Sequence, residues 1–161
     1  MIKALIKIFK NIFAKSNIYI TFTTNFKDMD KEKLMIGNWV WNTHNQKPEQ
    51  IRELLETGVM LDYNDIYGYD EIGPIPLSNE ILMKNGIELV EVGDHGPATP
   101  KHLYNRYEKW FVHTQWKDTF LWFDRHTKKY NLWEMKGFEF DSVHGLQQAL
   151  LLNGIEKKIV L

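Results

Sequence analysis

Hydrophobic and polar residues alternate in short runs along most of the chain after residue 34, as they do in half-buried strands. Turn-forming residues separate several of these runs, and short turns between strands favour antiparallel pairing. A gap of two residues, 117–118, predicts a tight turn between two of them. The segment 50–56 fits either one or two helical turns or a strand paired with 36–42. The predicted strands are 36–42, 59–63, 87–92, 107–116, 119–124 and 130–135.

Two segments carry the start and stop signals of helices. Ser78 is placed to cap a short helix that Gly86 ends. Asp141 or Ser142 begins a longer helix that Gly154 closes. The predicted apolar side of this longer helix consists of Val143, Leu146, Ala149 and Leu150. The sequence therefore predicts an α+β fold, with helices on one side of a mostly antiparallel sheet and a loop over 65–77.

The amino-terminal segment 1–15 has apolar residues at helical spacing and lysines on the opposite side, and we expect an amphipathic helix there. It either folds back on the body, lies on a membrane surface or a partner, or belongs to a poorly ordered extension. Lys7 and Lys10 interrupt the apolar core that a signal peptide requires. A strand over 17–24 and a linker over 25–33 complete an extension, 1–33, before a single predicted domain, 34–161. No apolar run reaches 18 residues, so we expect no transmembrane insertion.

The net charge of −1 hides a strong asymmetry. Residues 1–48 carry 8 basic and 3 acidic side chains, residues 49–95 carry 2 and 11, and residues 96–161 carry 10 and 7. Such a layout either steers charged partners or reflects solvated faces that differ in sign. On the first interpretation, the acidic segment occupies a basic nucleic-acid channel of a partner. The acidic residues predicted to contact that partner are Glu53, Glu56, Asp62, Asp65, Asp70 and Glu71.

Motifs of catalysis and metal binding are scarce. The chain has no cysteine, which excludes disulfides, a thiol nucleophile and cysteine metal sites. It contains neither nucleotide-binding glycine motif, no G-x-S-x-G and no H-E-x-x-H. His113 and His126, each followed by a threonine, faintly suggest a small metal-free phosphodiesterase, but that family has histidine and threonine two positions apart. We therefore expect a protein that is not an enzyme and uses no metal or cofactor.

The segment 101–136 has the most unusual composition, with 10 of the 22 aromatic residues and 8 of the 20 basic ones. Aromatic rings among cations are typical of single-stranded nucleic-acid binders, and Trp and Arg are also preferred anchors of protein interfaces. The remaining interpretation is a sheet core, yet a domain of this size rarely buries six tryptophans fully. The residues predicted to contact a partner are Trp110, Trp116, Trp122, Arg125, Lys128 and Lys129.

Three motifs together resemble a group of small accessory proteins carried by phages and mobile elements. They are LMIGNWVWN (34–42), IGPIPLSNEILMKNGIE (72–88) and FDSVHGLQQALLLNGIE (140–156). The chain departs from the group's pattern at Ile87, where Phe is usual, and at Gly145, where a bulkier residue is common. The resemblance implies a phage-related origin and action in the cytoplasm of a bacterial host, but it implies no activity and no site residues.

These observations lead to one main functional prediction and two alternatives. The main prediction is a non-enzymatic inhibitor of a host defence machine, of the anti-CRISPR type, that occludes a host protein or ribonucleoprotein complex. The first alternative is an accessory protein that binds RNA or single-stranded DNA directly. The second is a phosphodiesterase that uses His113 and His126.

Overall fold

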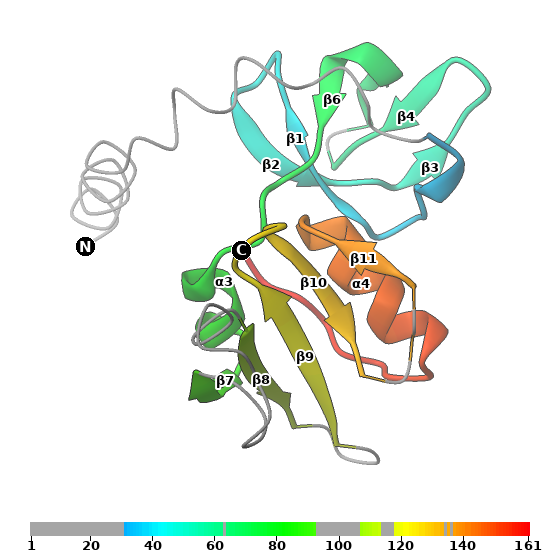
Figure 1. The fold of residues 1–161 in the computed structure, drawn as a ribbon. Helices are drawn as coiled ribbons and strands as arrows, with labels where there is room; N and C mark the ends of the chain where they lie inside the picture. Colours follow the sequence, from blue (N-terminus) through cyan, green and yellow to red (C-terminus); the bar gives the residue numbers. More distant parts are fainter. Residues whose placement is uncertain (1–30, 63, 93–106, 114–117, 134, 136) are drawn as a thin grey trace, which may run out of the picture.

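The fold can be followed over most of the chain (Figure 1). The computed structural model describes residues 31–62, 64–92, 107–113, 118–133, 135 and 137–161. The predicted amphipathic helix, 1–15, and the predicted strand, 17–24, lie outside these residues. From the predicted linker, Lys31–Lys33 forms a short 3-10 helix, η2.

The predicted α+β class is confirmed, since the described residues form antiparallel sheets and two α-helices. The largest sheet has five strands in the order β11-β10-β9-β8-β7, with every neighbouring pair antiparallel. Helix α4 lies against one face of this sheet, and α3 precedes β7 (Figure 1). The bounds are β7 (Ile87–Val92), β8 (Tyr107–Val112), β9 (Thr119–Asp124), β10 (Lys129–Leu132), β11 (Glu139–Phe140), α3 (Asn79–Lys84) and α4 (Val143–Leu152).

A second part of the fold, which we call the upper lobe, holds two three-stranded sheets in the orders β2-β1-β6 and β3-β4-β5. Its hydrophobic cluster includes Val40, Ile51 and Val59. Strand β1 connects this cluster to the larger one, because Val40 belongs to the upper cluster and Trp41 to the larger. The bounds are β1 (Trp39–Asn42), β2 (Lys47–Gln50), β3 (Glu53–Leu54), β4 (Gly58–Met60), β5 (Ile66–Gly68), η3 (Tyr69–Glu71) and β6 (Ile72–Gly73).

Polar contacts also join the upper lobe to α4 and the chain end. The backbone N–H of Trp39 donates to Gln147 Oε1 at 2.9 Å, and its indole N–H donates to the carbonyl of Ile159 at 2.9 Å. Gln147 in turn donates to the carbonyl of Gly37 at 2.9 Å. These bonds place α4 between the upper lobe and the five-stranded sheet.

Both predicted helix caps are confirmed. Ser78 Oγ accepts from the N–H of Ile81 at 3.3 Å, and Ser142 rather than Asp141 caps α4. The glycines that end the two helices have positive φ angles, +64° at Gly86 and +71° at Gly154, which disfavour other residues. The predicted apolar side of α4 is buried.

Three local predictions need correction, and one that was left open is resolved. Strand β8 ends at Val112, which pairs with Thr119, so 113–118 connects the strands instead of the two-residue turn predicted at 117–118. The ambiguous segment 50–56 forms no helix: its first residue ends β2, which pairs with β1, and Glu53–Leu54 pairs with β4. Short strands β5 and β6 occupy part of the loop predicted over 65–77. Strand β10 ends at Leu132, short of the predicted 130–135. Strands of two or three residues are too short to leave a periodic pattern.

Candidate functional site

The two faces of the five-stranded sheet differ because successive side chains of a strand point to opposite sides. The inner face packs on α4 and holds Trp110, Leu121 and Leu132, all at most 1% exposed. The residues between these positions point to the opposite face. We call its ring-bearing part the outer aromatic face, made of Lys109, Phe111, Phe120, Trp122 and Trp133.

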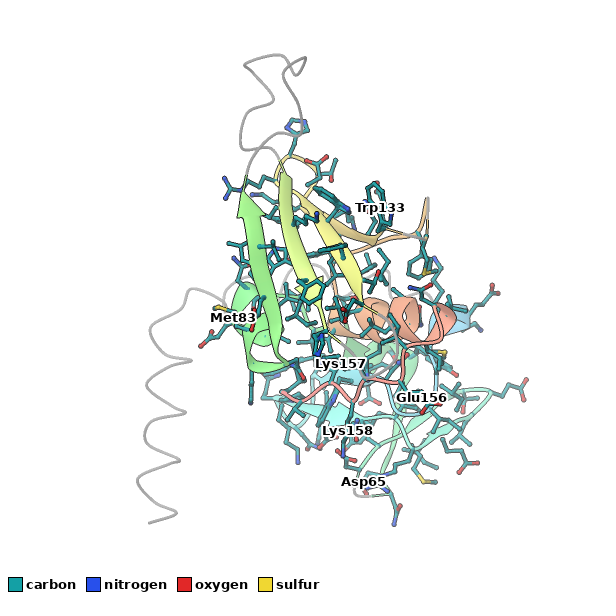
Figure 2. All side chains as sticks on the ribbon, turned by 90° about the horizontal axis from the view of Figure 1, so that it is seen from below. Asp65, Met83, Trp133, Glu156, Lys157 and Lys158 are labelled. Atoms are coloured by element: carbon teal, nitrogen blue, oxygen red, sulfur yellow. The ribbon has the colours of Figure 1, made fainter. Side chains whose placement is uncertain are left out.

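The rings of the outer aromatic face form a row of two ring pairs, with Lys109 lying over one ring of each pair. Cross-strand pairing places Phe111 opposite Phe120, with ring centroids 5.3 Å apart. Trp122 lies 5.8 Å from Trp133, whose side chain is 63% exposed (Figure 2). Lys109 Nζ lies 4.1 Å from the centroid of Phe120 and 5.5 Å from that of Trp122, within the range of cation–π attraction. The row therefore offers ring surface with a cation over it.

Trp110 is a correction to the predicted set of contact residues. It is 1% exposed, and its indole N–H donates to Glu108 Oε2 at 3.0 Å. It belongs to the core because it shares the inner face with aliphatic neighbours that pack on α4. Trp122 is partly buried and lies on the outer face, so its contact with a partner stays a prediction, and Trp116 lies outside the described residues.

The predicted basic contacts do not lie among the rings of the outer aromatic face. Arg125 Nε is 2.8 Å from Glu108 Oε1, a carboxylate that is almost fully buried. Lys129 forms an ion pair with Asp141 at the start of α4. Lys128 is exposed, with its ammonium 6.0 Å from the ring of Phe123. Two of the three predicted cations, Arg125 and Lys129, therefore form ion pairs within the protein.

The predicted acidic residues all lie in the upper lobe, which separates them from the outer aromatic face. All six are exposed except Asp62, which is partly buried and accepts from the N–H of Gln50 at 3.1 Å and from Arg52 Nε at 3.3 Å. Glu56 lies in the turn between β3 and β4, whereas Asp65 lies at the opposite end of that sheet, in the turn between β4 and β5. The acidic side chains are therefore distributed over both ends of this sheet.

The structure does not bring the two candidate catalytic histidines together. His113 follows the end of β8 that pairs with Thr119, whereas His126 follows the other end of β9. A six-residue strand such as β9 is about 20 Å long, too far for two imidazoles to act on one phosphate. His113 Nδ1 instead lies 2.9 Å from Asp118 Oδ1 at an exposed site. Within the described ranges, no three His, Asp or Glu side chains are grouped as a metal site would require.

Sequence reasoning missed Lys109, Phe111, Phe120 and Trp133. A partial signal was present: Val112, Leu121 and Leu132 are aliphatic and share one face with Trp110 once the strands are paired. The face with more aliphatic residues is the one expected to be buried against a helix. Applying this rule requires the register, which the sequence did not supply.

Comparison with known proteins assigns this chain to no family. No protein-family model, no curated protein and no solved structure matches the chain significantly. The resemblance of the three motifs to phage accessory proteins therefore stays a prediction. Among the described residues, no helix combines the length and apolar character needed to cross a membrane.

Proposed function

We propose that this protein is a non-enzymatic binding protein that holds a protein partner on the outer aromatic face. The observation that supports this most directly is the row of rings ending in Trp133, which is 63% exposed on a sheet whose other face is packed. Large exposed rings on a rigid sheet supply contact area at little entropic cost, and tryptophan is the residue most enriched among interface hot spots.

Charge favours a protein partner over a nucleic acid. A single-stranded nucleic-acid site needs several cations along the phosphate path. Among the described residues of the outer aromatic face, Lys109 is the basic side chain, and exposed Glu88 pairs in register with Phe111 beside it. The acidic upper lobe would also repel phosphates. A neutral aromatic face with a separate acidic lobe suits a partner protein that binds nucleic acid through a basic channel.

The proposed partner is therefore a nucleic-acid-handling host machine, which the protein inhibits by occlusion. The aromatic face would anchor the complex, and the acidic lobe would take the place of nucleic acid in the channel. The phage resemblance of the three motifs makes a bacterial defence complex in the host cytoplasm the natural candidate. This proposal rests on the surface chemistry together with that resemblance.

The experiment compares Trp133→Ala with Met83→Ala. Met83 is a matched control because it is 61% exposed but lies on α3, away from the outer aromatic face. Each tagged variant is expressed in a bacterial host, and the host proteins that it captures are quantified. The captured host protein is then tested for nucleic-acid binding while the variant is bound to it. We expect the wild type and Met83→Ala to block that binding. The affinity of Trp133→Ala for the captured protein should be lower by about 30-fold, as for loss of a hot-spot residue.

Charge variants test the second half of the proposal. In Glu53→Gln/Glu56→Gln, capture should persist while the block of nucleic-acid binding weakens, because the anchor remains and the mimicry of phosphate is reduced. If Trp133→Ala captures and blocks as well as the wild type, the outer aromatic face is not the anchor and the proposal is refuted.

The position of Lys109 over two rings favours a second candidate, direct binding of RNA or single-stranded DNA. The purified protein would then bind a labelled oligonucleotide with a logarithmic affinity that falls by about 0.7 per neutralised phosphate for each tenfold rise in salt. If the protein binds with that salt dependence and Lys109→Gln abolishes the binding, the partner is a nucleic acid and not a protein.

A further inference from the structure

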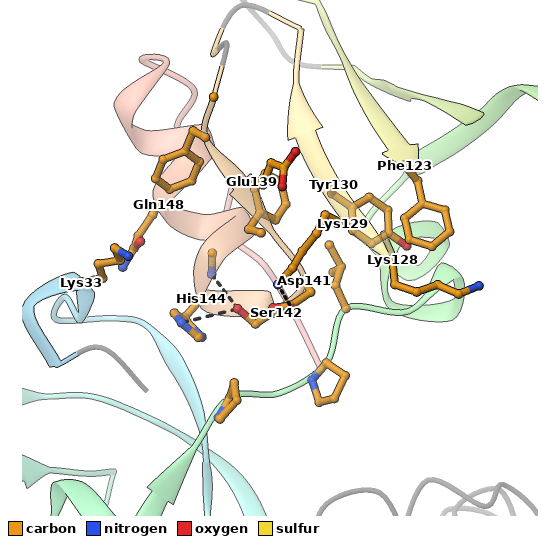
Figure 3. Close-up of a pocket in the computed structure, with 17 residues that line it drawn as sticks. Lys33, Phe123, Lys128, Lys129, Tyr130, Glu139, Asp141, Ser142, His144 and Gln148 are labelled. Atoms are coloured by element: carbon orange, nitrogen blue, oxygen red, sulfur yellow. Dashed lines mark hydrogen bonds and ion pairs between the residues drawn. The ribbon is translucent and has the colours of Figure 1, made fainter. Parts of the chain in front are cut away.

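A pocket of about 940 Å³ lies between the amino-terminal end of α4, strands β10 and β11, and the segment 74–77 (Figure 3). Two of its rings, Tyr130 and Phe140, belong to the core and are only 3% and 4% exposed, so they have little free surface for a ligand. More accessible ring surface lies on the outer aromatic face, where Trp133 is exposed and Phe111 is partly exposed. The geometry of that face indicates what kind of segment it binds.

Three residues of the outer aromatic face lie side by side across the strands. Phe111 on β8 pairs in register with Phe120 on β9. The backbone N–H of Trp133 donates to the carbonyl of Phe120 at 3.0 Å, which places Trp133 on the other side of Phe120. Because neighbouring strands are about 4.8 Å apart, the backbone positions of Phe111 and Trp133 are separated by about 9.6 Å.

This separation matches the repeat of a polyproline II helix. Such a helix rises about 3.1 Å per residue with three residues per turn, so residues three positions apart lie on the same side, about 9.3 Å from each other. Two prolines separated by two residues can therefore contact Phe111 and Trp133 at the same time. In a β-strand, by contrast, the side chains on one face repeat every 6.7 Å or so, which is about two-thirds of the separation.

Hydrogen-bond donors lie beside these rings. Lys109 Nζ is 4.1 Å from the centroid of Phe120, midway along the line from Phe111 to Trp133. Among the described residues, no atom accepts from the indole N–H of Trp133. The carbonyls of a polyproline II helix have no internal hydrogen bonds and can accept from such donors, whereas those of an α-helix are bonded within the helix. The donors therefore favour an extended segment over a helical one.

Charges near Phe111 indicate a basic residue in the bound segment. Glu88 is exposed and pairs in register with Phe111, so it lies one strand beyond that ring. Asp118 is also exposed at this end of the sheet, with its Oδ1 2.9 Å from His113 Nδ1. Lys109 is the cation on this face, and it lies over Phe120 and Trp122. A lysine or arginine next to the prolines would therefore be attracted to the end of the line at Phe111.

From this arrangement we infer that the outer aromatic face binds a proline-rich segment of the partner, in the polyproline II conformation, with a basic residue beside the prolines. The prolines contact Phe111 and Trp133, and Glu88 pairs with the basic residue. Lys109 and the indole N–H of Trp133 donate to carbonyls of the segment. Proline-rich chains are already extended when free, so binding orders them at low entropic cost. This inference rests on the proposed function, because it names the part of the partner that the anchor holds.

The test titrates the full chain into labelled, end-blocked peptides and follows binding by fluorescence polarisation. The first probe has two prolines separated by two residues and a lysine beside them, and we expect it to bind. The second probe has the same composition with adjacent prolines, and the third has glutamate in place of the lysine. We expect the second to bind at least about fivefold more weakly, because it reaches one end of the line, and the third about threefold more weakly.

Variants locate the binding on the outer aromatic face. Trp133→Ala should weaken binding of the first probe by at least about tenfold, whereas Met83→Ala, an exposed residue on α3, should not change it. Glu88→Lys should bind the glutamate probe more tightly than the lysine probe, which reverses the order seen with the wild type. Glu156→Lys is the matched charge control, because Glu156 is exposed in the segment after α4, and it should keep the wild-type order.

Three results would overturn the inference. They are that no probe binds at concentrations up to about 1 mM, that Trp133→Ala binds the first probe as well as the wild type does, and that the spacing of the prolines makes no difference. A dimer that Trp133→Ala dissociates in sedimentation would also overturn it, because a second copy would then occupy the face.

The inference and the proposed function fail in different ways. If no probe binds but Trp133→Ala still loses the host protein, the anchor is correct and its ligand is not proline-rich. If the first probe binds through Trp133 but Trp133→Ala captures the host protein as well as the wild type does, the proline site is correct and the proposed function is refuted.

Discussion

The substitution Gly145→Ala tests how closely α4 approaches β11, the contact that forms one corner of the pocket. Gly145 is in the first turn of α4 and is buried. A Cβ atom added there would lie 2.6 Å from the Cβ of Phe140 and 3.2 Å from Ser142 Oγ. Neither Cβ can rotate away, because its position is set by the backbone. The helix must therefore move away from the strand to accept an alanine.

Two effects of opposite sign determine the magnitude. Alanine is favoured over glycine inside a helix by about 1 kcal/mol. Overpacking a close contact costs about 1–3 kcal/mol, and displacing α4 also strains the 3.4 Å cap bond from the Gly145 N–H to Ser142 Oγ, a cap contact of about 1 kcal/mol. We therefore expect Gly145→Ala to lower the free energy of unfolding by roughly 1–2 kcal/mol, although helix propensity alone predicts an increase.

Urea unfolding followed by tryptophan fluorescence and circular dichroism measures this effect. Leu151→Ala is the control, since Leu151 is on the same helix and is 54% exposed, and we expect it to change stability by less than about 0.5 kcal/mol. A 1–2 kcal/mol loss should lower the melting temperature of a 161-residue chain by about 2–8 °C. An unchanged or higher stability of Gly145→Ala would refute the close approach of α4 to Phe140.

Further predictions concern the core, the surface and the pH response. Trp110→Ala should lower the free energy of unfolding by about 3–5 kcal/mol, because the ring is fully buried, and a loss below about 1 kcal/mol in urea unfolding would contradict the inner face. Trp133→Ala should stay within about 0.5 kcal/mol of the wild type in the same assay, and a large loss would mean that its ring is packed. Since burial lowers the pKa of His144 in the folded state, the unfolded chain binds the proton first, and stability should fall as the pH drops below about 6.5. In His144→Gln, the urea midpoint should fall less between pH 7.5 and 5.5 than it does in the wild type. An identical pH dependence in the variant would show that His144 is not the group responsible.

The local elements were predictable because their signals are local. A serine before a helix and a glycine after it act through bonds within a few residues, so Ser78, Gly86, Ser142 and Gly154 could be identified without any knowledge of the fold. Strands β7 to β10 of the large sheet were predictable for the same reason, although β8 and β10 proved shorter than predicted and the two-residue β11 was not predicted at all. The end of β8 is set by pairing with β9, which depends on a partner strand.

The candidate site was only partly predictable, because an alternating strand has two faces and the sequence does not say which one α4 covers. Trp110 and Phe111 are adjacent and both aromatic, yet one is core and the other belongs to the outer aromatic face. The segment 101–136 was therefore recognised as unusual, while the choice among its rings was wrong for Trp110.

The sequence by itself determined the α+β class, the two capped helices, the apolar side of α4 and the acidic character of the upper lobe, since each follows from composition or from short-range spacing. Only the tertiary structure decided which rings face outward and that Lys33, Tyr130 and Gln148 share a pocket. The physical reason is that burial depends on what packs against a residue, and those neighbours come from distant parts of the chain whose register no local pattern specifies.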